Sequence, residues 1–219
     1  MLIPYSTCLN YTRQHYSYVI HIGAHLGEEY EAYKEAGVQK TFWFEANPKI
    51  YEQLVANFAN QTIDNFFCQA LYNVDDKEVE FKITNNGQSS SILELGTHKQ
   101  HYPNITVTDT IKVKTKIFDT FVKENQNQFN LNQFKTFVNL DVQGVEHEVL
   151  LGFGDLLKEN NPLFNIDAIY TEVNFEEVYK DAKTIAFINV LLGSYGFEKI
   201  ISSPTHYGWG DALYIRKRK

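Results

Sequence analysis

The feature that most constrains the fold is a repeated alternation of strand-like and helix-like segments. Short runs rich in β-branched and aromatic residues occupy residues 16–22, 40–46, 65–72, 134–142 and 166–173. Segments with helical periodicity follow four of these runs, at residues 28–37, 49–60, 145–160 and 182–196. Strands that alternate with helices predict an α/β fold with a doubly wound, mostly parallel sheet, which binds its ligand beyond the carboxyl ends of the strands.

The end of the chain breaks the alternation. Residues 197–202 and 211–217 are two strand-like runs with only a loop between them. Parallel neighbours need a longer crossover, so this last pair must be antiparallel. We therefore predict a Rossmann-like sheet of seven strands, mostly parallel, with an antiparallel last strand.

A second irregularity lies near residues 77–118. Residues 77–84 and 110–118 alternate polar and apolar side chains with period two, and they bracket a stretch of small polar residues. Period-two alternation is typical of half-buried strands. The segment therefore predicts a β-hairpin-like insertion that carries a loop near the ligand edge of the sheet.

Size and charge restrict the possible partners. The chain has 219 residues, 43% of them hydrophobic, and a net charge of −7. This size suits one domain, and the acidic balance argues against a nucleic-acid partner, which needs a basic surface. No apolar run approaches the roughly 20 residues that span a bilayer. We expect a cytoplasmic protein without a membrane partner, and the oligomeric state stays open.

The stretch VIHIGAHLGEEY, residues 19–30, connects the first strand to the first helix. Gly23 and Gly27 flank Ala24 and His25 in a loop where a backbone can approach a ligand closely. Their G-x-x-x-G spacing differs from the G-x-G-x-x-G of dinucleotide-binding proteins. Glu45 ends the second strand, where a carboxylate can accept both hydroxyl hydrogens of an adenosine ribose.

Charge at the start of this helix separates two ligands. Glu28, Glu29 and Glu31 fall in its predicted first turn. A pyrophosphate needs free N–H groups and the positive end of the helix dipole there, and carboxylates repel it. A positively charged ligand such as S-adenosylmethionine is tolerated. Ordinary stabilisation of the helix dipole is the alternative explanation of the same glutamates.

Five segments carry a family resemblance. VIHIGAHLGEE, FWFEANP, FVNLDVQGVEHEVLLGF, YTEVN and DALYIRK, in this order between Val19 and Lys217, resemble the FkbM-type branch of class I S-adenosylmethionine-dependent methyltransferases. The resemblance implies one methyltransferase domain over residues 1–219, with S-adenosylhomocysteine as product. The family usually has Asp at the position of His21 and often Asn at that of His25. The predicted cofactor-binding residues are His21, Gly23, Ala24, His25, Gly27, Glu45, Ala46, Gln69, Ala70 and Asp141.

The candidate catalytic residues are the carboxylates at two strand ends. Asp141 ends the fourth strand, and the resemblance implies that it lies beside the methyl-bearing end of the cofactor. It is predicted to be a general base or acceptor-orienting group, unless it caps the next helix and only binds cofactor. Glu172 ends the fifth strand and is predicted to orient the acceptor together with Asn174, unless it bonds loop N–H groups. Glu146 is a candidate capping acid.

Other side chains are candidates for binding the acceptor or a metal ion. Ser89 and Ser90 in the insertion are predicted to form the acceptor wall, with a plain polar turn as the alternative. His21 and His25 do not share a helix face, so we predict no metal site, and a magnesium requirement stays open. The alternative bases are His98, His101, His147 and His206, and the candidates for stacking on a sugar are Tyr102, Tyr207 and Trp209.

The sequence thus predicts an S-adenosylmethionine-dependent O-methyltransferase acting on a hydroxyl of a small polar acceptor, a sugar or glycan. The sugar rests on the family, whose members also methylate polyketide-type alcohols. One alternative is an NAD-linked or nucleotide-sugar oxidoreductase. Another is a methyltransferase-fold binding module that has lost catalysis because of His21 and His25. The acidic balance makes a nucleic-acid methyltransferase the least attractive enzyme.

Overall fold

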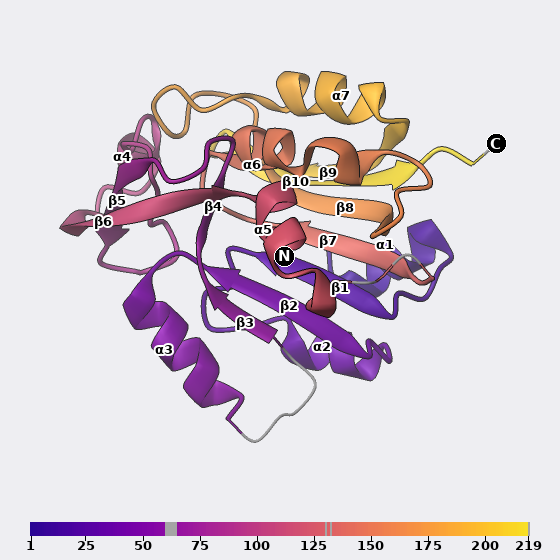
Figure 1. Ribbon diagram of the computed structural model, residues 1–219. Coiled ribbons are helices and arrows are strands. Elements are labelled where there is room, and N and C mark those ends of the chain that lie inside the picture. Colours follow the sequence, from indigo (N-terminus) through magenta and orange to yellow (C-terminus); the bar gives the residue numbers. More distant parts are fainter. Residues whose placement is uncertain (60–64, 130, 132, 219) are drawn as a thin grey trace.

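The chain is built on one large sheet (Figure 1). The computed structural model describes residues 1–59, 65–129, 131 and 133–218. Within these residues a seven-stranded sheet has the order β3-β2-β1-β7-β8-β10-β9. Its strands are β1 (Tyr18–Ile22), β2 (Lys40–Glu45), β3 (Asn65–Cys68), β7 (Lys135–Leu140), β8 (Asn165–Asn174), β9 (Phe197–Pro204) and β10 (Trp209–Arg216). β10 is antiparallel to β8 and β9, and the other neighbours are parallel, which confirms the predicted sheet.

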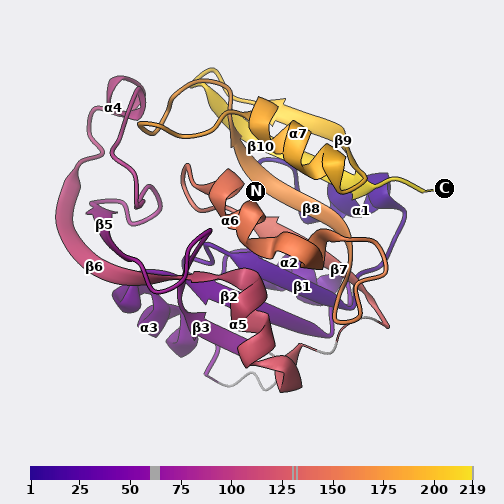
Figure 2. The same ribbon diagram turned by 45° about the horizontal axis from the view of Figure 1, so that its top comes forward.

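Helices cover both faces of this sheet (Figures 1 and 2). One face is packed by α1 (Tyr5–Thr12), α2 (Tyr30–Glu35) and α3 (Pro48–Asn57), and the other by α5 (Phe118–Glu124), α6 (Glu146–Phe153) and α7 (Ile185–Ser194). Short 3₁₀ helices occur at η1 (Gln126–Gln128) and η2 (Gly154–Leu157). Along β2, Trp43 packs with the first group, whereas Phe42 and Phe44 pack with the second. Burial on both faces explains why this strand is continuously apolar.

The insertion forms a smaller sheet. β5 (Glu78–Thr84) and β6 (Val107–Ile117) are antiparallel, β4 (Ala70–Tyr72) pairs with β6 in parallel, and α4 (His98–His101) lies in the connection between β5 and β6. This confirms the hairpin-like insertion. Figure 2 shows β6 and α4 set to one side of the main sheet.

Three of the predicted elements have other bounds in the structure. The single strand predicted at residues 65–72 is broken at Gln69, whose N–H donates to the carbonyl of Glu45. Ala70 then pairs with Thr115 in the smaller sheet, so one apolar run serves two sheets. The helix predicted from residue 28 begins at Tyr30 and has 6 residues. The helix predicted to reach residue 60 ends at Asn57, and residue 60 lies outside the described residues.

Among the described residues, we find no helix with the length and apolar character needed to cross a membrane.

Candidate active site

A cavity of about 520 Å³ lies between the carboxyl ends of the main strands and the insertion. This volume is within the range typical of small-molecule and cofactor sites. Most of the predicted site residues line it, namely His21, Gly23, Ala24, His25, Glu45, Ala46, Gln69, Ala70, Ser89, Ser90, Asp141 and Glu172. The topology therefore brings together side chains that are far apart in the sequence.

Two predicted site residues, Gly27 and Asn174, do not line this cavity. Gly27 has φ +80°, and a Cβ there would lie 2.5 Å from the ring of Phe58, so this glycine permits a turn packed against neighbouring side chains. Asn174 ends β8 with its side chain fully buried and forms a bridge with Thr184. The structure therefore places both residues outside the lining of this cavity, and their binding roles stay predictions.

Gly23 brings the ends of β1 and β7 together. Its φ is +82°, and a Cβ on it would overlap the carbonyl oxygen of Asp141. The N–H groups of Gly23 and Ala24 both donate to the carbonyl of Phe44 at the end of β2. The loop is thereby fixed to both neighbouring strands.

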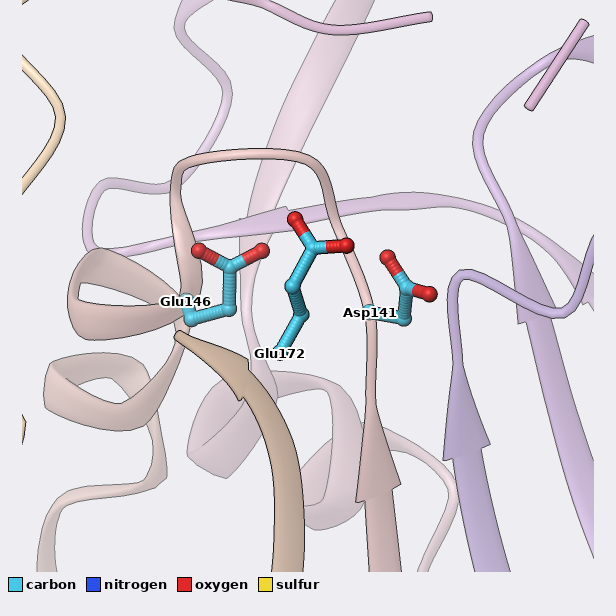
Figure 3. A group of neighbouring side chains, drawn as sticks. All are labelled: Asp141, Glu146 and Glu172. Atoms are coloured by element: carbon cyan, nitrogen blue, oxygen red, sulfur yellow. The ribbon is translucent and has the colours of Figure 1, made fainter. Parts of the chain in front are cut away.

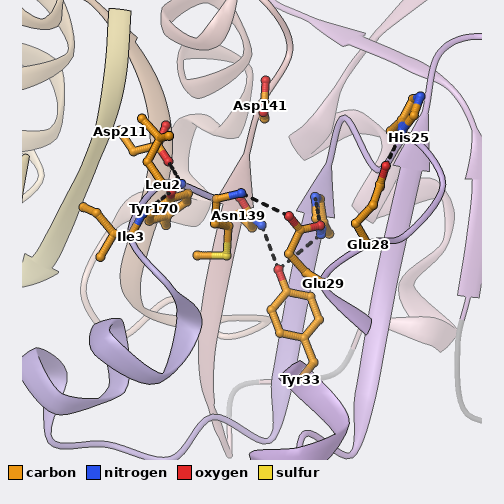
Figure 4. Close-up of polar contacts among 12 residues, drawn as sticks. Leu2, Ile3, His25, Glu28, Glu29, Tyr33, Asn139, Asp141, Tyr170 and Asp211 are labelled. Atoms are coloured by element: carbon orange, nitrogen blue, oxygen red, sulfur yellow. Dashed lines mark hydrogen bonds and ion pairs between the residues drawn. The ribbon is translucent and has the colours of Figure 1, made fainter. Parts of the chain in front are cut away.

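Of the three glutamates after this loop, only one lies in the first turn of the helix that follows. Glu28 and Glu29 precede α2, and Glu31 alone of the three lies in its first turn. Glu28 Oε1 lies 2.6 Å from His25 Nδ1 (Figure 4). Desolvation opposes the charge on Glu28, but the hydrogen bond and charge of His25 together with backbone hydrogen bonds outweigh it and lower the pKa of Glu28 to about 2. The same bond raises the pKa of His25.

His21 is a neutral buried side chain. It stacks on Trp43 with ring centroids 4.9 Å apart, and burial lowers its pKa. Asn139 Nδ2 donates to the Tyr33 hydroxyl over 2.7 Å, so that hydroxyl can donate to His21 Nδ1, 3.2 Å away (Figure 4). Nε2 then carries the ring proton and lies 3.9 Å from Glu29 Oε2. Glu29 lines the cavity and brings a carboxylate close to the position where the family usually has Asp.

Glu45 is held by the backbone on both sides. Its Oε1 accepts the N–H of Asn47 at 2.7 Å and its Oε2 accepts the N–H of His25 at 2.9 Å. The side chain is almost fully buried, and desolvation raises its pKa. A carboxylate has about four lone-pair sites, so two more bonds can still be accepted.

Asp141, Glu146 and Glu172 form a compact acidic group (Figure 3). They can present oxygens within 4.8 Å of one another. Burial raises the pKa of Glu146 to about 7, that of Glu172 well above its ordinary value, and that of Asp141 in the same direction. Like charges this close oppose joint ionisation, so the group retains protons near neutral pH.

The carboxylate oxygens of Glu146 accept hydrogen bonds from backbone N–H groups. Oε1 accepts the N–H groups of Val142 and Gly144 at 3.1 and 3.0 Å, and Oε2 also contacts the N–H of Gly144. Glu146 therefore bonds the loop before α6 rather than the first turn of that helix. An acidic group with oxygens occupied in this way does not by itself define a metal site.

Asp211 was not expected in the cavity. It lies opposite Glu172 in the β8–β10 pair, and its Oδ2 accepts the N–H of Leu2 at 2.6 Å (Figure 4). Burial raises the pKa of Asp211 to about 7. The antiparallel pairing of β9 with β10 was predicted from loop length, but the pairing of β10 with β8 that creates this neighbour was not.

The sequence matches one family over most of its length. The family model described as "Methyltransferase FkbM domain" matches residues 21–199. The chain belongs to the FkbM-type family of S-adenosylmethionine-dependent methyltransferases. This confirms the resemblance found in the sequence.

Solved structures share the fold of this FkbM-family protein at low sequence identity. The methyltransferase domain of bacterial CtHen1-C is 6% identical, with 99% of this chain and 98% of that chain covered and a TM-score of 0.52. A candidate methylase from Haemophilus influenzae is 16% identical, with 98% and 96% covered and a TM-score of 0.50. An S-adenosylmethionine-dependent methyltransferase from Aquifex aeolicus is 7% identical, with 98% and 90% covered and a TM-score of 0.48. No curated protein matches this sequence.

The insertion gives the FkbM-family cavity its second wall. Ser89 Oγ lies 3.3 Å from His98 Nε2, whereas Ser90 Oγ donates to the carbonyl of Gly87 at 2.7 Å. Trp209 Nε1 donates to the Tyr102 hydroxyl at 3.0 Å, and both residues line the cavity. Tyr207 and three of the alternative bases, His101, His147 and His206, do not line it.

Gln143 and Tyr179 also line the cavity, and the sequence interpretation missed both. Gln143 Nε2 donates to Asp141 Oδ1 at 2.6 Å and to Glu172 Oε2 at 3.0 Å. The Tyr179 hydroxyl donates to Gln143 Oε1. Gln143 could have been found, because it follows Asp141 closely in the LDVQG segment of this methyltransferase. Tyr179 belongs to no motif that the sequence analysis recognised.

Proposed function

We propose that this protein transfers a methyl group from S-adenosylmethionine to a hydroxyl of a small, polar, uncharged acceptor, a sugar or glycan. The observation that carries the proposal is one cavity with two different walls. The first consists of the Gly23 loop, Glu45 and Glu29, and the second of the insertion. Asp141 and Glu172 lie at the carboxyl ends of β7 and β8, on the floor of the same cavity.

The charges around the cavity support this cofactor. Among its described lining residues there is no lysine or arginine, whereas six carboxyl side chains line it, those of Glu28, Glu29, Glu45, Asp141, Glu172 and Asp211. A sulfonium and an ammonium group suit such a site, and the pyrophosphate of NAD does not. Glu45 would hold the ribose hydroxyls. Glu29 Oε1 lies 3.3 Å from the amino group of Met1, so Glu29 would receive the cofactor's ammonium group through Oε2, on the side near His21.

Asp141 and Glu172 have different roles at the acceptor. When bound, S-adenosylmethionine provides an electrophilic methyl carbon on a positively charged sulfur. Asp141 accepts the proton of the acceptor hydroxyl as the new bond forms. The raised pKa of Glu172 favours its protonated form, which holds a second acceptor oxygen by hydrogen bonding. Alignment by these two groups lowers the entropic part of the barrier.

The same charges favour a neutral acceptor over a polyanion. A nucleic acid or phosphorylated sugar would meet carboxylates and no lysine or arginine among the described residues of the cavity. Tyr102 and Trp209 offer aromatic side chains, and the Tyr102 hydroxyl, which accepts the indole N–H of Trp209, can still donate to a sugar oxygen. A sugar with apolar C–H faces and hydroxyl edges fits this wall.

The direct test is calorimetric titration with S-adenosylhomocysteine and, in parallel, with NAD. We expect micromolar binding of the first and none of the second. Protein that binds S-adenosylhomocysteine is then incubated with radiolabelled S-adenosylmethionine and a panel of neutral methyl glycosides, with the corresponding sugar phosphates alongside. Binding of NAD alone would support the oxidoreductase, and binding of neither would support the binding module.

Removing the Glu45 carboxylate should weaken the cofactor complex. We expect Glu45→Ala to reduce S-adenosylhomocysteine affinity by about 1–3 kcal/mol, the typical contribution of hydrogen bonds to a charged group. Calorimetry measures the change, and thermal unfolding checks that loss of the contacts to His25 and Asn47 has not unfolded the loop. Glu52→Ala removes an exposed carboxylate from α3 and serves as control. Unchanged S-adenosylhomocysteine affinity in a folded Glu45 variant would show that Glu45 does not bind the ribose.

A further inference from the structure

One amide group connects the two carboxyls proposed to act on the acceptor. Both hydrogens of Gln143 Nε2 are used, one toward Asp141 Oδ1 at 2.6 Å and one toward Glu172 Oε2 at 3.0 Å. The backbone at Gln143 is also fixed, because Ser91 Oγ donates to its carbonyl at 2.6 Å. A side chain held at both ends in this way fixes the distance between the carboxyls.

Tyr179 determines which way this amide points. Its hydroxyl donates to Gln143 Oε1. The opposite orientation would place the amide oxygen against Asp141 Oδ1, which has no proton to donate when Asp141 is ionised. Tyr179 is itself almost fully buried and lies directly against Gly144, where an added Cβ would be 2.9 Å from its side chain. The chain of contacts therefore runs from Tyr179 through Gln143 to both carboxyls.

We propose that Gln143 is a positioning residue that fixes Asp141 and Glu172 relative to each other through one amide, and that Tyr179 sets the orientation of this amide. The proposal rests on the proposed function of the two carboxyls. Gln143 engages Oδ1 of Asp141 and Oε2 of Glu172, so the second oxygen of each carboxyl is the one offered to the acceptor. Gln143 reaches the reaction only through these two side chains.

The test measures the titration of the carboxyl pair. Protein with ¹³C-labelled aspartate and glutamate carboxyls is titrated by NMR, and the signals are assigned with Asp141→Asn and Glu172→Gln. The amide donates to the ionised oxygens and lowers both pKa values, so Gln143→Leu should move the apparent titration midpoints of the pair upward. Tyr179→Phe should move them in the same direction by less. Unchanged midpoints in the Gln143 variants would overturn the proposal.

Other titratable groups near the pair also affect its titration midpoints, and all of them except Tyr179 in the Tyr179→Phe variant are the same in every sample. Those that influence Asp141 or Glu172 are Glu29, His25, Glu146, Tyr179, Asp211 and the amino group of Met1. Gln53→Leu is the control, because the Gln53 side chain is exposed on α3 and lies outside the cavity lining. Its carboxyl midpoints should equal those of the wild type.

A second variant separates positioning from folding. Gln143 has φ +56°, a left-handed conformation that glycine adopts readily, so Gln143→Gly removes the amide without straining the backbone. It should remain folded and still show the upward shift. S-adenosylhomocysteine binding is measured on the same samples. If the wild type fails to bind it, the proposed function fails; if binding persists but the midpoints do not move, this proposal alone fails.

Discussion

The Gly23→Ala variant is expected to lose S-adenosylhomocysteine binding by at least about 100-fold, which is roughly 2.7 kcal/mol. An added Cβ would overlap the carbonyl oxygen of Asp141, and this atom belongs to the backbone, so it cannot turn away as a flexible side chain would. The ends of β1 and β7 must separate. Both borders of the proposed cofactor site would then move. Calorimetry measures the binding, and circular dichroism confirms that the sheet persists.

Gly37→Ala is the matched control for this variant. Gly37 has φ +78°, close to the +82° of Gly23, but an added Cβ there meets nothing within 4 Å. It therefore reports the cost of a left-handed alanine alone, roughly 1–2 kcal/mol of stability, and should leave binding unchanged. If the Gly23 variant behaved like the Gly37 variant, the close approach of β1 and β7 would not matter for the ligand.

The second large effect is expected at Asp141. Asp141→Asn should lower turnover by roughly 10²- to 10⁴-fold, the usual contribution of general base catalysis, while S-adenosylhomocysteine affinity stays nearly unchanged. Asparagine keeps an oxygen that can accept the hydrogen bond from Gln143, but it cannot take up the proton of the acceptor. The rate is measured by methyl transfer to the neutral glycoside found active with the wild type. Equal losses of binding and turnover would make Asp141 a cofactor-binding residue.

Glu172→Gln provides the comparison. Burial and the nearby Asp141 and Glu146 raise the pKa of Glu172 well above its ordinary value, which favours its protonated form. Glutamine resembles that protonated form and should reduce turnover much less than Asp141→Asn does. A larger loss at Glu172 than at Asp141 would exchange the roles of the two carboxyls.

The local sequence pattern was sufficient to predict the mostly parallel main sheet and the acidic residues that follow or end its strands. Period-two and period-3.6 patterns locate the main strands and helices, and parallel strands bring Glu45, Asp141 and Glu172 to one edge. The two loop glycines show the limit of this reasoning. Gly23 and Gly27 have nearly equal φ angles, yet one lies against the backbone of Asp141 and the other against the ring of Phe58. Only the tertiary neighbours distinguish them.

The contacts that the sequence could not predict all join distant segments. The Tyr179 hydroxyl donates to Gln143, 36 residues earlier in the chain. Asp211 faces Glu172 because β10 lies between β8 and β9 in the sheet. The break at Gln69 has a similar cause. Its N–H pairs with Glu45 while the next residue pairs with β6, and no property of residues 65–72 alone indicates that division.

The insertion leaves and rejoins the main fold at almost the same place. Tyr72 pairs with Ile117, and a Cβ on Gly152 of α6 would lie 2.5 Å from the carbonyl of Tyr72 and 3.5 Å from the nitrogen of Phe118. The intervening hairpin contributes Ser89, His98 and other residues of the acceptor wall, while the Gly23 loop and Glu45 lie outside it. A hairpin of different sequence could therefore replace residues 73–116 between these two points. Such a replacement would change the proposed acceptor wall and leave the proposed cofactor-binding residues in place.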